Sequence, residues 1–194
     1  MREVNQRYLI VCQGNTEYYY CKSLKESLPR NVQRKISIEI VHDSKDLSNL
    51  ILEAIKRRNK AKSEKNPYTG IWLVFDHDNF PKLEESFVKI EKEGFKFVFN
   101  SICLEYWFIL HFEKCGRAFH DASEATNYLK QRYWPEYRKN QINHYQYLQR
   151  LIEVAISNTR NLRELAGDEL KMHERNPYSN LDELIDFINK LQQK

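Results

Sequence analysis

The fold is decided by one stretch of sequence, Gly70-Ile71-Trp72-Leu73-Val74-Phe75-Asp76-His77-Asp78-Asn79. Residues 70–75 form a continuous apolar run, which is typical of a strand buried on both faces of a sheet. Polar residues follow at once, so the strand ends where a group of acidic side chains begins. In open α/β sheets the loops at the carboxyl ends of the strands converge on the functional crevice. We therefore expect a parallel sheet whose chemistry lies beside Asp76.

Similar runs on either side of this stretch extend the sheet. Further strands are predicted at residues 8–12, 36–41 and 95–99. The segments between them place apolar residues at helical spacing, and two of them stop at Pro29 and Gly94, as helices do. The resulting βαβαβαβ order requires a mainly parallel sheet with right-handed crossovers. The predicted fold class is therefore α/β.

The second half of the chain changes character, because residues 104–112 are apolar and aromatic and no strand-like run follows them. Residues 176–180 offer a turn and an N-cap for the last helix. We expect an α/β domain over residues 1–115 and a helical C-terminal extension packed on it over residues 116–194. Helices are predicted there for residues 122–132, 142–165 and 181–191.

The composition excludes several classes of protein. Of 194 residues, 41% are hydrophobic, which argues against disorder, and no apolar stretch approaches the length of a signal peptide or a membrane span. Four cysteines without a CxxC pair are typical of reduced thiols in a cytoplasmic protein. Because 31 basic and 27 acidic residues nearly cancel to +4, the distribution of charge, not its sum, must identify a partner.

Acidic residues gather at the expected ends of two strands. Asp76 and Asp78 are two residues apart, so both carboxylates can leave the sheet edge toward one volume. Two such groups repel unless a cation lies between them, and Mg²⁺, or Mn²⁺ in its place, suits an oxygen-only site. Glu17 could add a third carboxylate. The alternatives are that the aspartates only end a strand and that Glu17 only complements a helix dipole.

Two basic segments could hold nucleic acid. One is a run within residues 56–65, and the other is the segment 131–150, where cations alternate with aromatic residues. Cations on phosphates and aromatic rings under bases are how single strands are held. The alternatives are a solvated helix end for the first segment and packing of the tail for the second. The candidate contacts are Lys56, Arg57, Arg58, Lys60, Arg132, Arg138 and Lys139.

Three blocks of sequence, at residues 11–20, 74–80 and 100–113, resemble the RloB-like family. These proteins are associated with bacterial restriction and abortive-infection loci and are related to the Toprim domain of topoisomerases, primases and overcoming-lysogenisation-defect nucleases. The resemblance implies a Toprim-like fold and a Mg²⁺-dependent nuclease that cleaves RNA or DNA in antiphage defence. Other defence-system proteins are then further partners, and a homo-oligomer is compatible with the pattern.

The Toprim pattern implies a glutamate followed by glycine at one strand end and an Asp-x-Asp at another. The Asp-x-Asp carries over onto Asp76 and Asp78, but the glutamate is replaced by Gln13. Three consequences are open: Glu17 supplies the missing carboxylate, the Gln13 carbonyl ligates the metal with weaker affinity, or the site has lost catalysis. An engineered Glu→Gln change is a further explanation. Glu105 matches a family glutamate, and because an unpaired carboxylate on an apolar stretch is costly, we expect it to face the site. The alternative function is a catalytically impaired nucleic-acid-binding or regulatory subunit.

Overall fold

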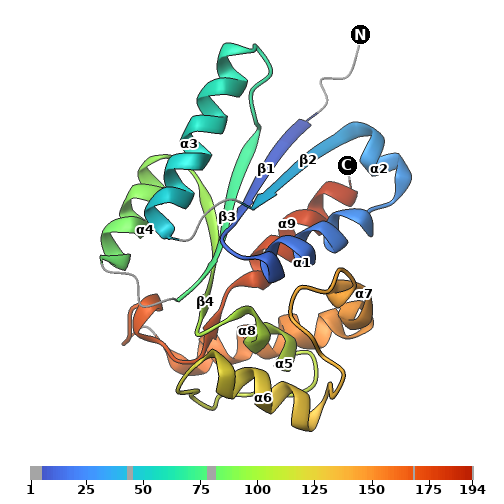
Figure 1. The fold of residues 1–194 in the computed structure, drawn as a ribbon, viewed down its shortest axis with the longest axis vertical. Helices are drawn as coiled ribbons and strands as arrows, with labels where there is room; N and C mark the ends of the chain where they lie inside the picture. Colours follow the sequence, from blue (N-terminus) through green and yellow to red (C-terminus); the bar gives the residue numbers. More distant parts are fainter. Residues whose placement is uncertain (1–5, 43–45, 78–81, 168, 194) are drawn as a thin grey trace.

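A computed structural model describes residues 6–42, 46–77, 82–167 and 169–193. Its centre is a five-stranded sheet in the order β2-β1-β3-β4-β5 (Figure 1). The first four strands are parallel and β5 is antiparallel to β4, so the predicted α/β class is confirmed. The strands are β1 (Gln6–Cys12), β2 (Ile36–His42), β3 (Gly70–Asp76), β4 (Lys96–Ser101) and β5 (Tyr178–Ser179).

Helices cover both faces of the sheet (Figure 1). Alternate residues of β1 enter different cores: Leu9 and Val11 pack with α3 and α4, whereas Tyr8 and Ile10 pack with α1 and α9. This alternation follows from the two-residue period of a strand. The helices are α1 (Asn15–Glu26), α2 (Arg30–Lys35), α3 (Leu47–Ser63), α4 (Leu83–Lys92), α5 (Leu104–Ile109), α6 (Ala122–Arg132), α7 (His144–Leu148), α8 (Ile152–Ala166) and α9 (Leu181–Gln192), with short 3₁₀ turns η1 (Gln149–Leu151) and η2 (Met172–Glu174).

Strand β5 corrects the expectation that no strand follows residues 104–112. It contains two residues, too few to leave a periodic pattern in the sequence. The expected N-cap position is confirmed at Asn180, but the Asn180 side chain makes no capping bond to α9. Its Oδ1 accepts a hydrogen bond from the Phe99 backbone N–H (2.7 Å) and its Nδ2 donates to the Phe97 carbonyl (3.1 Å). Asn180 therefore continues the backbone pairing of β4 beyond the end of β5.

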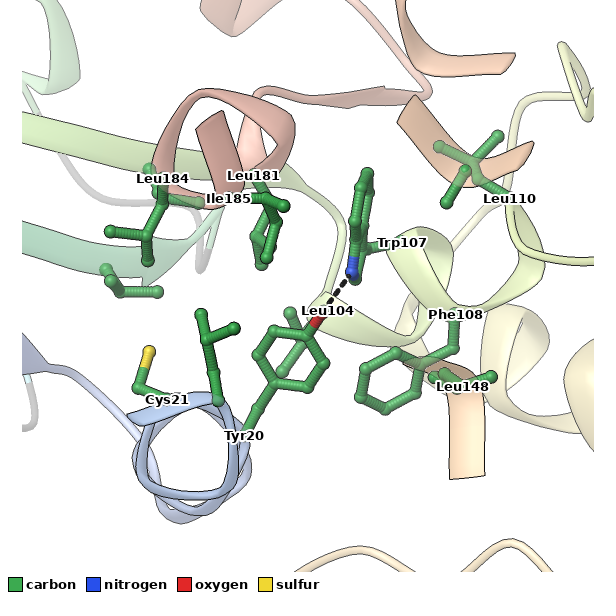
Figure 2. Packing of buried hydrophobic residues seen from close by; sticks show 14 of the residues in the cluster. Tyr20, Cys21, Leu104, Trp107, Phe108, Leu110, Leu148, Leu181, Leu184 and Ile185 are labelled. Carbon is green, nitrogen blue, oxygen red and sulfur yellow. Dashed lines mark hydrogen bonds between the residues drawn. The ribbon is translucent and has the colours of Figure 1, made fainter. Parts of the chain in front are cut away.

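The helix expected over residues 142–165 is divided into α7, η1 and α8. One buried cluster unites these helices with the sheet and contains residues from both sides of residue 115. Within it, Trp107 Nε1 donates to the Tyr20 hydroxyl (2.9 Å), while Phe108 and Leu148 pack beside them (Figure 2). The division at residue 115 stays a prediction. In the part of the chain that the structure describes, no helix has the length and apolar character needed to cross a membrane.

The bond between Trp107 and Tyr20 gives a test of this core. Tyr20→Phe keeps the volume of the ring but leaves a buried indole N–H without its acceptor, so we expect the free energy of unfolding to fall by about 1–3 kcal/mol. Chemical denaturation measures this change. Tyr19→Phe, at a partly exposed position in the same helix, is the matched control and should leave stability nearly unchanged. Equal stability of the Tyr20→Phe variant and the original protein would contradict this account of the core.

Candidate functional site

The candidate site lies where the carboxyl ends of three neighbouring parallel strands meet. Gln13 follows β1, Asp76 ends β3, and Asn100 is the β4 residue paired with Asp76. Helices α1 and α5 begin close behind β1 and β4. This is the edge at which α/β sheets place their functional groups.

The Asp76 carboxylate is held by groups from two different elements. Its Oδ1 accepts a hydrogen bond from Asn100 Nδ2 (3.0 Å), and its Oδ2 accepts one from the Leu104 backbone N–H at the start of α5 (3.1 Å). The Asp76 backbone N–H donates to Gln13 Oε1 (3.0 Å). Each carboxylate oxygen therefore has a fixed direction that is set by neutral donors.

A second layer of hydrogen bonds orients Asn100. The Ser179 hydroxyl in β5 donates to Asn100 Oδ1 (2.7 Å), and both side chains are buried. Because Asn100 Oδ1 is occupied as an acceptor, its amide nitrogen is the atom that faces Asp76. The direction of the Asp76 carboxylate thus depends on the short strand near the C-terminal end of the chain.

Glu17 lies in the first turn of α1 with 6% of its surface exposed. Its carboxyl group folds back over Gly14, so closely that a β-carbon at position 14 would overlap Glu17 Oε2. A side chain at position 14 would therefore displace the Glu17 carboxyl group, although the Gly14 backbone angle itself is ordinary. Glu17 and Asp76 also share a hydrogen bond, which raises the pKa of Asp76.

Glu105 lies in the first turn of α5 and is 2% exposed. Its Oε1 accepts a hydrogen bond from the Tyr137 hydroxyl (2.7 Å) and lies 3.3 Å from Lys139 Nζ. Both partners come from the loop between α6 and α7, so this loop closes one side of the site. We call Glu17, Asp76 and Glu105 the carboxylate cluster.

The carboxylate cluster contains more negative than positive charge. Burial raises the pKa of Asp76 well above its usual range, and the neighbouring charges of Glu17 and Glu105 raise it further. Burial also raises the pKa of Glu17, with Glu105 adding to the rise, while its hydrogen bond to Asp76 and the charge of Lys139 oppose it. A cation bound among these groups would relieve their repulsion.

The donor chemistry of the cluster fits a hard divalent cation. Carboxylate oxygens are the ligands that Mg²⁺ and Mn²⁺ prefer. Among the residues that the structure describes, no three or more His, Cys, Asp or Glu side chains are grouped as ready ligands around one point. Asp78 lies outside the described residues and stays a predicted ligand. Asp76 and Glu17, whose carboxyl groups touch, are the described side chains that could hold a metal.

The turn between β4 and α5 is strained. Ile102 has a φ of 86°, which is uncommon for any residue with a β-carbon and a genuine outlier for a branched one. This turn brings the Leu104 N–H to Asp76 and carries Glu105 into the cluster. Backbone strain of this kind concentrates at functional sites, where the surrounding structure enforces it. The sequence contains no signal for this turn, since an isoleucine between Ser101 and Cys103 indicates only a strand or a core position.

The basic residues expected on α3 lie elsewhere. The helix runs from the carboxyl end of β2 to the amino end of β3, so its second half lies at the opposite edge of the sheet from Asp76 (Figure 1). There Arg57 pairs with Glu53 (2.5 Å) and Glu39 (2.7 Å), and Arg58 pairs with Glu93 (2.6 Å). Lys56 and Lys60 also have acidic neighbours within 4.0 Å. The role of these four residues in nucleic-acid binding stays a prediction.

The three basic residues predicted after residue 130 lie in different surroundings. Arg132 ends α6 and lies over the Tyr128 ring, 5.2 Å from its centroid. Arg138 is exposed in the next loop, and its neighbour Lys139 contacts Glu105. Lys139 is therefore the predicted basic residue that the structure brings to the carboxylate cluster.

A family model described as RloB-like protein matches residues 8–188. The chain belongs to the RloB-like family. Comparisons with curated proteins and with solved structures gave no match. The match runs from β1 into α9 and so includes the carboxylate cluster, Gln13 and the Asn100–Ser179 pair.

In this RloB-like protein, sequence reasoning selected the carboxyl groups but missed the residues that hold them. Asn100 and Tyr137 were not expected at the site, although Asn100 lies within one of the three blocks that indicated the family. A polar residue inside a buried strand is the signal that could have found Asn100, because buried amides need partners. No comparable signal marks Tyr137 among the many aromatic residues around it.

Glu17→Gln tests the electrostatics of the cluster. Folding raises the pKa of Glu17 and Asp76. Below the pKa values of the unfolded chain, near pH 4, both groups are protonated and their contribution to stability is fully present. This contribution is lost as the pH rises through the higher pKa values of the folded protein. Gln cannot ionise, so in EDTA we expect the variant to gain stability over the original protein from about pH 4 upward, on the order of 1 kcal/mol at neutral pH.

Chemical denaturation across pH 3–8 measures the free energy of unfolding of the original protein and of the Glu17→Gln variant. Glu64→Gln, at an exposed acid on the end of α3, is the control and should leave the pH profile unchanged. Parallel profiles for Glu17→Gln and the original protein would show that Glu17 feels no repulsion in the cluster.

Proposed function

We propose that this protein is a Mg²⁺-dependent nuclease that cleaves phosphodiester bonds in RNA or DNA as part of antiphage defence. The observation that carries the proposal is the convergence of three carboxyl groups at the carboxyl edge of a parallel sheet, with Glu17 and Glu105 buried, Asp76 half-buried, and Lys139 beside Glu105. Membership of the RloB-like family supports it. We place the protein in the cytoplasm, where its four buried cysteines, which form no disulfide, remain reduced. Other defence-system proteins or a second copy of the chain would be its further partners.

The proposed roles follow from the contacts. Asp76 and Glu17, together with the predicted Asp78, would hold the metal, which when bound polarises a phosphoryl oxygen and lowers the pKa of a bound water. Asn100 and the Leu104 N–H hold the Asp76 carboxylate in one orientation before substrate arrives. Such fixed polar groups lower the reorganisation needed during reaction.

Glu105 and Lys139 have a different role in this scheme. Glu105 is already paired with Tyr137 and Lys139, so its charge is partly neutralised. Half of the Lys139 side chain is exposed (51%), whereas Glu105 is buried. Lys139 can therefore contact a phosphate oxygen of the substrate while Glu105 holds its ammonium group near the cluster.

A second function is favoured by Gln13. The Gln13 Oε1 accepts from the Asp76 N–H, and a neutral amide replaces the anionic family residue at this strand end. A catalytically impaired nucleic-acid-binding or regulatory subunit would have this arrangement. In favour of the nuclease, the carboxyl group of Glu17 reaches Asp76 from one helical turn further along the chain.

Combined Asp76→Asn and Asp78→Asn substitutions test the nuclease. We expect Mg²⁺-dependent cleavage to fall by about 100-fold or more, because the metal loses its anionic ligands. Labelled single-stranded DNA, duplex DNA, RNA and tRNA are incubated with Mg²⁺, Mn²⁺ or EDTA, and metal binding is followed by calorimetry. Glu64→Gln should cleave like the original protein. Metal-dependent cleavage that persists in the double variant would exclude this site as the catalytic centre.

Gln13→Glu distinguishes the two functions. A glutamate can still accept from the Asp76 N–H and adds a carboxylate to the cluster, so an impaired nuclease should gain Mg²⁺ affinity and cleavage activity. A dedicated binding subunit should bind nucleic acid and cleave nothing in either form. The same cleavage and calorimetry assays report both outcomes. Gln192→Glu, at an exposed position in α9, controls for the added charge.

A further inference from the structure

Helix α7 carries an aromatic side chain on its outer face. His144 and Leu148 are buried on the inner face, whereas Tyr147 is 53% exposed. The Tyr147 ring lies parallel to the ring of Trp134, with centroids 4.1 Å apart and planes inclined by 14°, and Trp134 is itself buried. One face of the Tyr147 ring therefore covers Trp134, and the exposed part of the ring faces solvent.

The support beneath this ring is rigid. Trp134 packs against Tyr137 and His144, with ring centroids 5.2 Å and 5.5 Å away. Leu148 anchors α7 in the main buried cluster beside Phe108 (Figure 2). A flat ring held in this way loses little freedom when a ligand stacks on it.

Two exposed arginines neighbour the rings of this stack in the sequence. Arg150 follows Tyr147 by three residues, which places both on one side of a helical segment. Arg138 follows Tyr137, whose ring packs on Trp134. Neither arginine forms an ion pair with another residue in the described ranges 6–42, 46–77, 82–167 and 169–193. Arg57 and Arg58 on α3, by contrast, are paired with glutamates.

The aromatic stack leads directly to the carboxylate cluster. Tyr137, which packs on Trp134, donates its hydroxyl hydrogen to Glu105, and Lys139 contacts the same Glu105 oxygen. The loop between α6 and α7 thus carries both the buried part of the stack and a side chain of the candidate site. A ligand on Tyr147 would lie within a short stretch of polynucleotide of the carboxyl groups.

We propose that Tyr147, with Arg138 and Arg150, forms a stacking site for an unpaired nucleobase of single-stranded or looped nucleic acid. The proposal deepens the proposed nuclease function and rests on it for the identity of the ligand. Every base has a face that can stack on an aromatic ring, and arginines beside the ring hold the backbone phosphates. Base pairs in a duplex are already stacked on both faces, so duplex nucleic acid cannot use the ring in this way.

The experiment separates stacking from simple coverage of Trp134. Tyr147→Phe keeps a flat ring, whereas Tyr147→Leu still covers Trp134 but offers no aromatic face. Binding of labelled single-stranded dT and rU oligonucleotides, and of a matched duplex, is measured by fluorescence anisotropy in EDTA, where metal-dependent cleavage does not occur. Thermal denaturation shows that each variant is folded.

We expect Tyr147→Leu to weaken single-strand binding by about 5- to 100-fold, the effect of one lost stacking partner, and Tyr147→Phe to bind like the original protein. Arg150→Gln should lower the salt dependence of binding by about one phosphate contact. Should the Leu variant unfold, Tyr147→Trp supplies the test, since it should bind single strands with quenching of its fluorescence by the stacked base.

Full single-strand affinity in a folded Tyr147→Leu variant, or binding to Tyr147→Trp without quenching, would overturn the stacking site. RNA or DNA cleavage at an unchanged rate in the Tyr147→Leu variant would also overturn the stacking site, but it would support the proposed nuclease function. Conversely, single-strand binding that depends on Tyr147, together with no cleavage in Mg²⁺ or Mn²⁺, would support the stacking site and contradict the nuclease function.

Discussion

The hydrogen bonds of the Asp76 carboxylate are the constraint on which the arrangement of this edge of the sheet depends. One oxygen is fixed by Asn100 in the neighbouring strand, and the other is fixed by the first N–H of α5 at Leu104. Because α5 begins at that bond, the position of Glu105 in its first turn is set at the same time. A single carboxylate therefore joins β3, β4 and α5 into one unit and brings a second carboxyl group with it.

The carboxylate cluster destabilises the folded protein, and packing elsewhere in the fold offsets this effect. Glu17 and Glu105 are buried and Asp76 is half-buried, and within the described residues Lys139 pairs with Glu105 alone among the three. Burial of unpaired charge is expensive. The Ile102 backbone adds strain next to them. These costs are borne by the large aromatic cluster in which Trp107, Tyr20 and Phe108 are completely buried. Stability gained in the core thus permits an electrostatically unfavourable edge.

Sequence reasoning found the parts of the structure that leave a pattern. The apolar runs of β1 and β3 predicted the buried strands, and acidic residues at helix and strand ends predicted Glu17 and Asp76. Strand β5 was missed because pairing of two residues depends on the neighbouring strand and not on their own sequence. The helix expected over residues 142–165 is present as α7, η1 and α8, which follow one another without a gap. The division was missed because a single 3₁₀ turn leaves no periodic pattern of its own in the sequence.

The surroundings of each charged group were harder to predict than its presence. The sequence contains the basic run on α3 but does not reveal that Glu39 and Glu93, from distant segments, pair with its arginines. Likewise Asn100 is one amide among several in the sequence, and its role depends on Asp76 and Ser179 meeting it from opposite sides. Long-range partners of this kind follow from the folded topology alone.

The bond from Ser179 to Asn100 also bears on how the protein is made. A ribosome synthesises β4 long before β5, so an emerging chain that ends between them has Asn100 without the hydroxyl that orients it. The Asp76 carboxylate then lacks its fixed direction until β5 has joined the sheet. A nascent chain that carries β1, β3 and β4 but not yet β5 therefore holds its carboxyl groups without the bond that organises them.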